Sequence, residues 1–186
     1  MSSIKVDKYS GEVSNDQIPI FKLRHYRQFL RRHAARAAGI VLALTHCSCE
    51  AFDGRVVAVH DGDTLTVLVA QQQVKVRLAG IDAPEIRQPF GTRSRQSLAQ
   101  ICHGKQATVA PTTRDRYGRT VGIVTCAGVD ANASQVAAGM AWVYVKYAPK
   151  GSPLYRLEAE ARAASLGLWA DPSPAPPWEY RHPPRQ

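Results

Sequence analysis

Alternating apolar and polar residues occupy the chain from about residue 55 and predict β-strands. The alternation is regular over 55–60 and 65–69, on either side of the pair Asp61 and Gly62, which is typical of a hairpin turn. Three further runs follow, at 74–78, 107–110 and 120–124. Five short strands are the number that closes a small barrel, so we expect a mainly β fold.

Apolar residues at helical spacing predict three helices. The first covers 94–102, and the second runs from about 129 to 140. The third begins with Ser152 as its N-cap and Pro153 at the first helical position, and it ends at Gly167. The expected fold class is therefore mainly β with helices, a five-stranded barrel plus three α-helices.

The two ends of the chain differ in composition from its middle. Residues 1–51 contain a basic stretch, the apolar run 37–44 and then small residues, which is the order of a secretory signal. We expect a leader that exports the protein to the periplasm or out of the cell. An amphipathic basic helix or an uncleaved anchor is the alternative. Residues 52–170 form the expected folded domain.

The last 16 residues, 171–186, contain 6 prolines. A segment of this composition should be extended and should have no core of its own. Trp178 is the residue that we expect to hold it against the domain.

The charge of the chain favours a polyanionic partner. Lys and Arg outnumber Asp and Glu by 24 to 15, and the first 50 residues hold 8 of the basic and 4 of the acidic residues, which leaves 16 and 11 for the rest. Nucleic acid or an anionic membrane surface would attract such a protein. No apolar run approaches the roughly 20 residues that cross a bilayer, so we expect no stable membrane span.

Four cysteines divide into two pairs. Cys47 and Cys49 lie in the expected leader, and Cys102 and Cys126 lie in the domain. Neither pair has further ligands at the spacing of a zinc site. The second pair would form a disulfide in an oxidising compartment and would remain two buried thiols in a cytosol, and the sequence leaves both open.

A first polar cluster, Asp61-Gly62-Asp63-Thr64, stands between the first two strands. Turn chemistry accounts for Asp61 and Gly62. It does not require the second carboxylate, Asp63, at the head of the next strand. Asp63 is therefore a candidate oxygen ligand for a hard cation such as calcium.

A second cluster runs from Arg77 to Glu85 and includes Asp82 and Pro84. Asp82 followed three residues later by Glu85 is also typical of a helix cap, which would explain both carboxylates. A cap does not explain Arg77, for which an ordinary solvated position is the alternative.

A third cluster, 114–119, places three arginines and Tyr117 in the turn between the last two strands. A solvated hairpin tip is the usual interpretation of such a run. However, guanidinium groups match phosphate oxygens, and an aromatic ring among arginines suits nucleic acid.

In their order and spacing, the three clusters resemble the staphylococcal nuclease (thermonuclease) family over about 52–169. The shared motifs are Asp-Gly-Asp-Thr, Arg-Leu-x-x-x-Asp-x-Pro-Glu and Asp-x-Tyr-Gly-Arg. The resemblance implies an OB-type five-stranded barrel with three helices. It also implies a Ca²⁺-dependent endonuclease acting on DNA and RNA, with water attacking phosphorus and the 5′ oxygen leaving. We expect a monomer.

Position by position, the resemblance implies a cation site and a base. Asp63 and Asp82 would be calcium ligands, together with the backbone carbonyl of Ala83. The family has threonine where this chain has Ala83, which removes a hydroxyl but keeps the carbonyl. Glu85 would orient or deprotonate the attacking water.

The resemblance also implies residues that contact the nucleic acid. Arg77 and Arg119 would bind the phosphate, and Tyr117 would lie at the scissile nucleotide beside Arg116, which stands where the family has lysine. Tyr147 would line the nucleotide pocket. A second pocket tyrosine would be Tyr144 or absent.

Two other classes of protein are the rivals of this interpretation. A non-catalytic nucleic-acid-binding domain could use the same barrel, but the catalytic positions are all present. A lipid-surface protein could use the basic leader as an anchor, but it would leave the acidic clusters unexplained.

Overall fold

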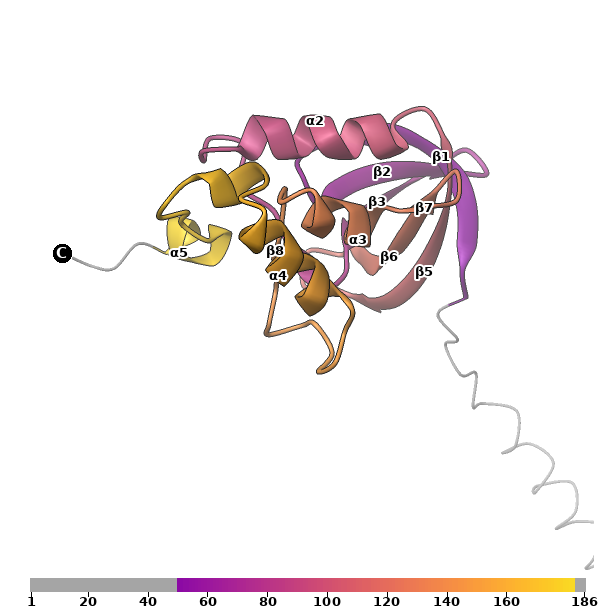
Figure 1. The fold of residues 1–186 in the computed structure, drawn as a ribbon. Coiled ribbons are helices and arrows are strands. Elements are labelled where there is room, and N and C mark those ends of the chain that lie inside the picture. Colours follow the sequence, from indigo (N-terminus) through magenta and orange to yellow (C-terminus); the bar gives the residue numbers. More distant parts are fainter. Residues whose placement is uncertain (1–49, 183–186) are drawn as a thin grey trace, which may run out of the picture. The chain divides into compact units, whose positions relative to one another are not determined.

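The computed structural model of the 186-residue chain describes residues 50–182 (Figure 1). The expected leader, with its apolar run 37–44 and with Cys47 and Cys49, lies outside the described residues except for its last two positions. None of the helices in this described part combines the length and the apolar character needed to cross a membrane.

Five strands form a closed barrel, as the alternation predicts. They are β1 (Phe52–Val59), β2 (Thr64–Val69), β3 (Gln72–Leu78), β5 (Gln106–Arg114) and β6 (Thr120–Cys126). Neighbouring strands are antiparallel in the order β3-β2-β1-β5-β6, and the parallel pairing of β3 with β6 closes the sheet. The short β7 (Val129–Asp130) extends the sheet beyond β6, and β4 (Ile81–Asp82) pairs with β8 (Trp142–Val143) in a separate two-stranded sheet.

Local irregularities let the strands bend into a barrel. The pairing of β1 with β2 shifts between Val56 and Ala58, and that of β5 with β6 shifts between Pro111 and Thr113. Bulges of this kind bend a strand, and they are also positions where proline is tolerated. Opposite the second bulge stands Gly122, where a Cβ would lie only 2.7 Å from the Ala110 carbonyl oxygen.

The inward-facing residues of the strands form the core. Its fully buried large side chains include Val56, Leu65, Val67, Val76, Leu78, Val109 and Val124. Leu98 from the first helix and Val136 from the second complete this cluster. Each such side chain contributes roughly 1.5–3 kcal/mol on burial, so the alternating pattern that predicts the strands also accounts for much of their stability.

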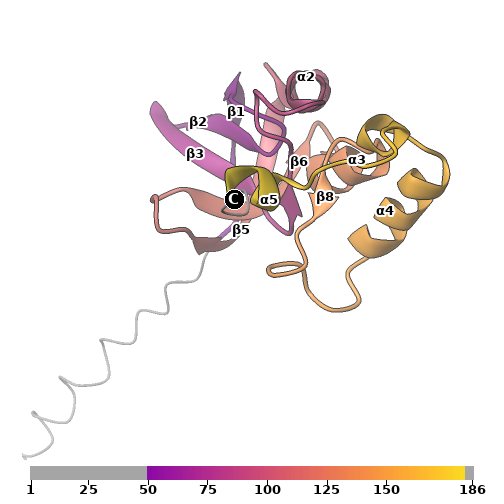
Figure 2. The same cartoon turned by 90° about the vertical axis from the view of Figure 1, so that its left-hand side faces the viewer.

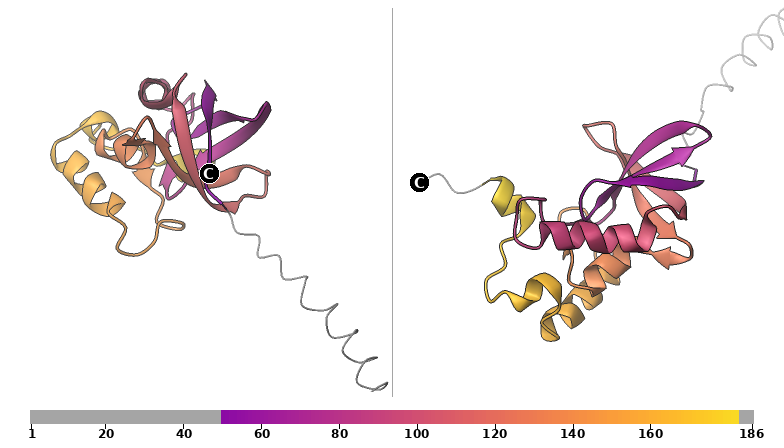
Figure 3. Two further views of the ribbon diagram at one scale, coloured as in Figure 1. Left: turned by 90° about the vertical axis from the view of Figure 1, so that its right-hand side faces the viewer. Right: turned by 90° about the horizontal axis from the view of Figure 1, so that it is seen from above.

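The helices lie around the barrel. They are α2 (Gly91–Cys102), α3 (Ala131–Ala137), α4 (Leu154–Ala163), the 3₁₀ helix η1 (Gly167–Ala170) and the short α5 (Pro177–Arg181). In the view of Figure 1, α2 crosses above the barrel, and α3 and α4 lie beside it. Figure 3 shows α3 between α4 and the barrel, and α3 contacts both α4 and β6.

The three predicted helices exist, but their ends differ from the prediction. Asp130 caps α3 by accepting a hydrogen bond from the Ala133 amide, so this helix begins at Ala131. Val129 therefore lies before the helix, in β7. In α4, the first helical residue is Leu154 and the helix ends at Ala163, well before Gly167. The chain there turns through Ser165, whose φ is 54°, and then enters η1.

The proline-rich tail is not extended throughout, which contradicts the prediction. Residues Pro177–Arg181 form α5, with proline at the N-terminal end where its missing N–H costs no hydrogen bond. The predicted contact of Trp178 is confirmed, since its ring stacks on that of Tyr144 with centroids 5.5 Å apart.

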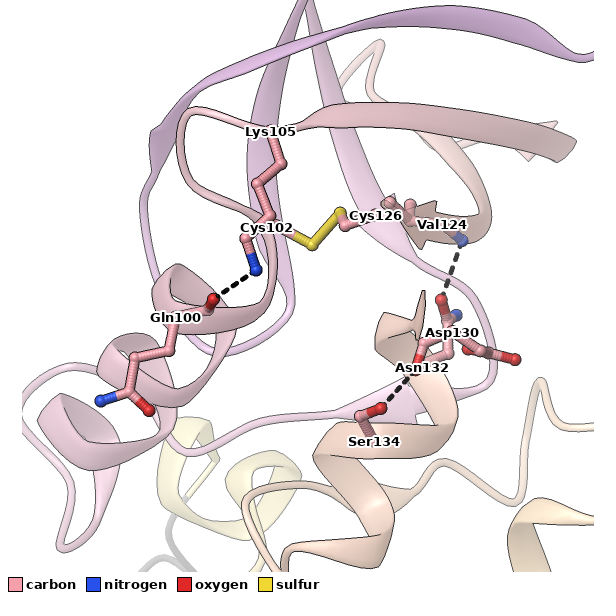
Figure 4. Close-up of a disulfide and its surroundings, with 8 residues drawn as sticks. All are labelled: Gln100, Cys102, Lys105, Val124, Cys126, Asp130, Asn132 and Ser134. Atoms are coloured by element: carbon pink, nitrogen blue, oxygen red, sulfur yellow. Dashed lines mark hydrogen bonds between the residues drawn. A yellow bond between two sulfur atoms is a disulfide. The ribbon is translucent and has the colours of Figure 1, made fainter. Parts of the chain in front are cut away.

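A disulfide joins the end of α2 to the end of β6. Figure 4 shows the bond between Cys102 and Cys126, whose Cα atoms are 5.2 Å apart. Both cysteines are fully buried. Two residues before Cys126 on β6, the Val124 amide donates a hydrogen bond to the Asn132 side chain, which in turn donates to the Ala79 carbonyl, so a buried side-chain amide joins α3 to the barrel.

Candidate active site

Two buried carboxylates come together at one end of the barrel. Asp63 lies just before β2 and Asp82 ends β4, and their exposed fractions are 3% and 0%. The backbone fixes Asp63, because its carbonyl accepts a hydrogen bond from the Leu78 amide at 2.8 Å. Its side chain accepts from the Ala83 amide at 2.8 Å and from the Thr64 hydroxyl at 2.9 Å. The two acidic clusters of the sequence thus form one site.

Arg77 connects these two carboxylates. Its Nη1 lies 2.5 Å from Oδ1 of Asp63, and its Nη2 lies 2.8 Å from Oδ1 of Asp82. Nη2 also donates to the Ile81 carbonyl at 3.3 Å. The side chain of Arg77 is only 17% exposed, so the solvated position considered above is wrong.

Glu85 stands on the loop that follows Asp82. Residues 83–90 contain no helix, so the interpretation of Asp82 and Glu85 as a helix cap is wrong. The carboxylate of Glu85 is instead paired with Arg181 of α5, whose Nη1 lies 2.8 Å from Oε1. Arg181 also reaches Asp82, with Nη2 2.6 Å from Oδ2. Figure 2 shows α5 in front of the barrel.

The loop that carries Asp63 is held in place by hydrogen bonds from a buried side-chain amide. Gln135 of α3 is fully buried and donates from Nε2 to the carbonyls of Gly62 at 2.7 Å and Ser94 at 3.1 Å. Gly62 itself permits this close packing, because a Cβ there would lie 1.8 Å from Oγ of Ser94 and 2.7 Å from Cβ of Ala83. Glycine is therefore required at this position by the lack of space for a side chain.

Arg119 lies on the same face of the sheet as Arg77. In the parallel pairing of β3 with β6, Val76 is opposite Thr120, so the residue after Val76 and the residue before Thr120 project to the same side. Arg119 donates from Nε to Oδ2 of Asp115 at 2.6 Å, within the turn between β5 and β6.

The rest of this turn is exposed. Tyr117 is 69% exposed, and its hydroxyl is 2.8 Å from Nη2 of Arg116. The guanidinium carbon atoms of Arg116 and Arg119 lie 4.9 Å and 5.6 Å from the centre of its ring. Arg116, Tyr117 and Arg119 thus form one small cationic and aromatic surface.

Tyr147 lies in a second exposed aromatic group. It is 64% exposed and packs edge-on against Tyr144, with ring centroids 4.9 Å apart. Tyr144 in turn stacks on Trp178 of α5 at an interplanar angle of 3°. Both candidate pocket tyrosines are therefore next to each other, and the tail covers one of them.

The structure gathers some of the predicted residues more tightly than others. Arg77, Asp63, Asp82, Ala83 and Glu85 form a continuous hydrogen-bonded cluster through their own contacts and through Arg181. Within residues 50–182, no hydrogen bond joins Tyr117, Arg116, Arg119 or Tyr147 to that cluster.

Burial and charge shift the pKa values in this cluster. Burial raises the pKa of Asp63, and the neighbouring Asp61 adds to this effect, while Arg77 opposes it. For Arg77, burial favours the neutral form, but the carboxylates of Asp63 and Asp82 outweigh it and raise its pKa. Burial likewise opposes the charge of Arg181, whose pKa is nevertheless raised by Asp82 and Glu85. Both arginines therefore stay charged.

The donor set suits a divalent cation with oxygen ligands. Four carboxylates, those of Asp61, Asp63, Asp82 and Glu85, face two guanidinium groups, which leaves an excess of two negative charges when all are ionised. Oδ2 of Asp63 and Oδ2 of Asp82 each accept one hydrogen bond and so keep a lone pair. Among the described residues no three Asp, Glu, His or Cys side chains form a ready metal site, so carbonyl or water oxygens would complete the shell.

Sequence reasoning missed two residues of this site. Arg181 lies in a proline-rich tail that carries no site motif, and only its charge could have indicated it. Gln135 is next to Val136 in the sequence but lies away from the apolar stripe of the predicted helix, so the helical pattern gives no sign that it is buried.

A shallow pocket of about 360 Å³ adjoins the cluster. Its lining residues are Glu85, Ile86, Arg87, Tyr180 and Arg181. The loop after Asp82 supplies one wall, and α5 supplies the other.

Comparison with known proteins places the chain among nucleases. Residues 75–171 match the model of a family described as staphylococcal nuclease homologue. The chain is 43% identical over 157 residues to a protein of Shigella flexneri named micrococcal nuclease, an alignment that covers 79% of this chain and 90% of the relative. It is 44% identical over 135 residues to an uncharacterized endonuclease of Escherichia coli, covering 72% of this chain and 88% of the relative.

A plant protein is similar over a shorter region. The staphylococcal-like nuclease CAN1 of Arabidopsis thaliana is 40% identical over 113 residues, which cover 61% of this chain and 35% of the relative.

Proposed function

The chain belongs to the family of staphylococcal nuclease homologues, and on this premise we propose that it is a calcium-dependent endonuclease that hydrolyses the phosphodiester bonds of DNA and RNA. The observation that carries the proposal is the convergence of Asp63 and Asp82 on Arg77 at one end of the barrel, with Glu85 joined to Asp82 through Arg181. A domain that only binds nucleic acid has no need for buried carboxylates, which repel phosphate.

The cation site would be formed by the carboxylates of Asp63 and Asp82 with the carbonyl of Ala83. A bound Ca²⁺ would offset the negative charge that builds up on the phosphate oxygens in the transition state. We favour calcium over magnesium because two carboxylates and a carbonyl suit a large, flexible coordination shell better than a strict octahedron.

Glu85 is the residue proposed to act on water. Its carboxylate, 41% exposed, stands at the edge of the shallow pocket, where a water molecule and a phosphate can both reach it. It would accept a proton as the water oxygen bonds to phosphorus, while the bond from phosphorus to the 5′ oxygen breaks and that oxygen takes a proton from solvent. The products would be a 3′-phosphate and a 5′-hydroxyl end.

Arg119 is the residue proposed to bind the phosphate directly, since its guanidinium group offers parallel donors to two oxygens. Donors that are aimed at charge developing in the transition state each contribute about 2.7–4 kcal/mol by analogy with oxyanion-hole deletions. Arg116, Tyr117 and Tyr147 would hold the neighbouring nucleotides by charge and by stacking.

One experiment tests the proposal. The purified protein is incubated with supercoiled plasmid, single-stranded DNA and RNA in the presence of calcium, magnesium or a chelator. We expect cleavage of all three in calcium and none in chelator. Full activity in a calcium-selective chelator with magnesium present would contradict the choice of cation. Binding of nucleic acid without cleavage under every condition would contradict the proposal that the protein is a nuclease.

We also propose that the protein is exported. The disulfide between Cys102 and Cys126 supports an oxidising compartment, and the composition of residues 1–51 supports a leader. N-terminal sequencing of the protein recovered from each cell fraction tests this, and full-length protein found only in the cytosol would contradict it.

A further inference from the structure

Arg181 comes from a part of the chain that the nuclease family model does not reach. The match ends at residue 171, and Arg181 is the last residue of α5. Even so, its guanidinium group enters the centre of the site. Nη2 lies 2.6 Å from Oδ2 of Asp82, and Nη1 lies 2.8 Å from Oε1 of Glu85.

Contacts other than this ion pair hold α5 in place. Gln88 donates from Nε2 to the Ala175 carbonyl at 2.5 Å, and Pro177 is buried. The ring of Trp178 stacks on Tyr144 at a centroid distance of 5.5 Å. The tail is therefore docked through Ala175, Pro177 and Trp178, and these contacts place Arg181 at the site.

Glu85 has few other restraints. It lies on an irregular loop, and within residues 50–182 Arg181 is the only group that donates a hydrogen bond to its carboxylate. A glutamate side chain has several rotamers, and holding it in one of them costs conformational entropy that must be supplied by a contact. Asp82, by contrast, is fully buried, and its carboxylate also accepts a hydrogen bond from Arg77. Arg181 thus links the side chain of Glu85, which can adopt several rotamers, to the buried side chain of Asp82.

We infer that Arg181 is a positioning residue that holds Glu85 at a set place relative to Asp82 for the attack on the phosphate. The inference rests on the proposed function and extends it to the tail. Arg181 acts through Glu85, so its effect is on turnover and depends on Glu85 being present. Binding of nucleic acid should change much less, because Arg181 is already occupied by two carboxylates.

A blocking role for Arg181 fits the geometry less well. Arg181 would block the cation if it used up the acceptor capacity of Asp82, but Oδ2 accepts one hydrogen bond and keeps a second lone pair. The charge count agrees when Asp61, Asp63, Asp82 and Glu85 are all ionised, because two negative charges then remain in excess with both arginines in place. A divalent cation and Arg181 can therefore be held by Asp82 at the same time.

The test is a set of variants measured by single-turnover cleavage of DNA and by calorimetric titration with calcium. We expect Arg181→Ala to lower the cleavage rate about tenfold or more, with KM changed less than about threefold and calcium affinity nearly kept. Arg181→Lys should recover part of the rate, because one ammonium group can reach one carboxylate at a time. Arg156→Ala is the matched control, since Arg156 is an exposed arginine paired with Glu160 on α4.

A double-mutant cycle separates positioning from a general structural role. If Arg181 acts through Glu85, adding Arg181→Ala to Glu85→Gln should slow cleavage no further. Multiplied effects of the two changes would overturn the inference, as would an unchanged rate in Arg181→Ala. A faster rate with tighter calcium binding would also overturn it, in favour of a blocking tail. Absence of cleavage by the wild type would overturn the proposed function and this inference together.

Discussion

Arg119 pairs with Asp115 through Nε alone, so in the described structure neither of its terminal nitrogens has a hydrogen-bond partner. Arg77 is the opposite case, because both of its terminal nitrogens are bound to Asp63 and Asp82. The family resemblance assigns phosphate binding to both arginines, but their hydrogen bonds in the structure differ. One presents free donors, and the other holds two carboxylates together.

Replacing Arg119 should therefore affect catalysis without affecting the fold. We expect Arg119→Ala to lower the cleavage rate by about a hundredfold or more, because it removes donors to the phosphate in the transition state. The midpoint of urea unfolding should fall by no more than the roughly 1 kcal/mol that such an ion pair in an outer turn contributes. Single-turnover kinetics and urea denaturation measure the two quantities, and an unchanged cleavage rate would remove Arg119 from the active site.

Replacing Arg77 should lower both the rate and the stability. Arg77→Ala leaves Asp63 and Asp82 buried beside each other without their shared cation, and breaking a buried ion pair in this way costs about 3–5 kcal/mol. We expect part of that loss to be recovered by added calcium, measured as a rise in the unfolding midpoint. If the variant unfolds at the same urea concentration as the wild type, the ion pairs of Arg77 with Asp63 and Asp82 contribute little to stability.

Glu85→Gln should separate the chemistry from the site that holds it. The amide keeps the volume of the side chain and can still accept a hydrogen bond from Arg181, so the loop should keep its position. It cannot take a proton from water, and general base catalysis typically contributes about 10²–10⁴-fold. Calcium titration and cleavage of the same preparation test this. Retained cleavage would show that Glu85 is not the base, whereas lost calcium binding would show that the change disturbs the cation site.

Removing the disulfide should destabilise the folded domain. The two cysteines are 24 residues apart, and closing a loop of that size contributes about 3.5 kcal/mol in the chain-entropy model. We expect the double variant Cys102→Ala and Cys126→Ala to unfold at a lower denaturant concentration by a corresponding amount. The wild type measured with and without reductant is the control, and coinciding unfolding curves would rule out the bridge in solution.

The turn that carries Arg119 should loosen in acid. Burial alone would raise the pKa of Asp115, but hydrogen bonds from Arg119 and from the Tyr117 amide outweigh it and hold that pKa below the ordinary 3.8. A carboxylate of this kind stabilises the fold above its ordinary pKa, and the contribution is lost as the pH falls through the lower folded value. Asp115→Asn should therefore be less stable than the wild type at neutral pH, by about 1 kcal/mol. The difference should shrink below pH 3.8, as urea denaturation across a pH series would show.

The strands were predictable because their signals are local, whereas the joining of the two acidic clusters into one site was implied only by the family resemblance. A period of two along 55–60 or 65–69 is visible in a few residues, and it decides which face is buried. Asp63 exceeds what its turn requires, and that excess indicates function. The ends of the helices were predicted less well, because the period of the apolar residues does not show where a helix begins. In α3 the start is set by the N-cap Asp130.

The unpredicted parts depend on contacts between distant segments. The parallel pairing of β3 with β6 closes the barrel, and no periodic pattern specifies which strands become neighbours. Arg181 meets Asp82 only because Trp178 and Gln88 dock the tail. A short helix among prolines gains its stability from such docking rather than from its own propensity.

Closure of the barrel has a consequence for how copies of this protein can associate. In the six-stranded sheet of the described residues, β7 forms one edge and has two residues, while β3 pairs with β6 only over Val76–Leu78 and β5 pairs with β1 only over Gln106–Val109. Long unpaired strand edges are the usual template for pairing between chains, and a two-residue edge offers almost none. If two copies of this domain associate by extending the main sheet, the short unpaired stretches of β3 and β5 are therefore the places where a second chain could add, and β7 is not.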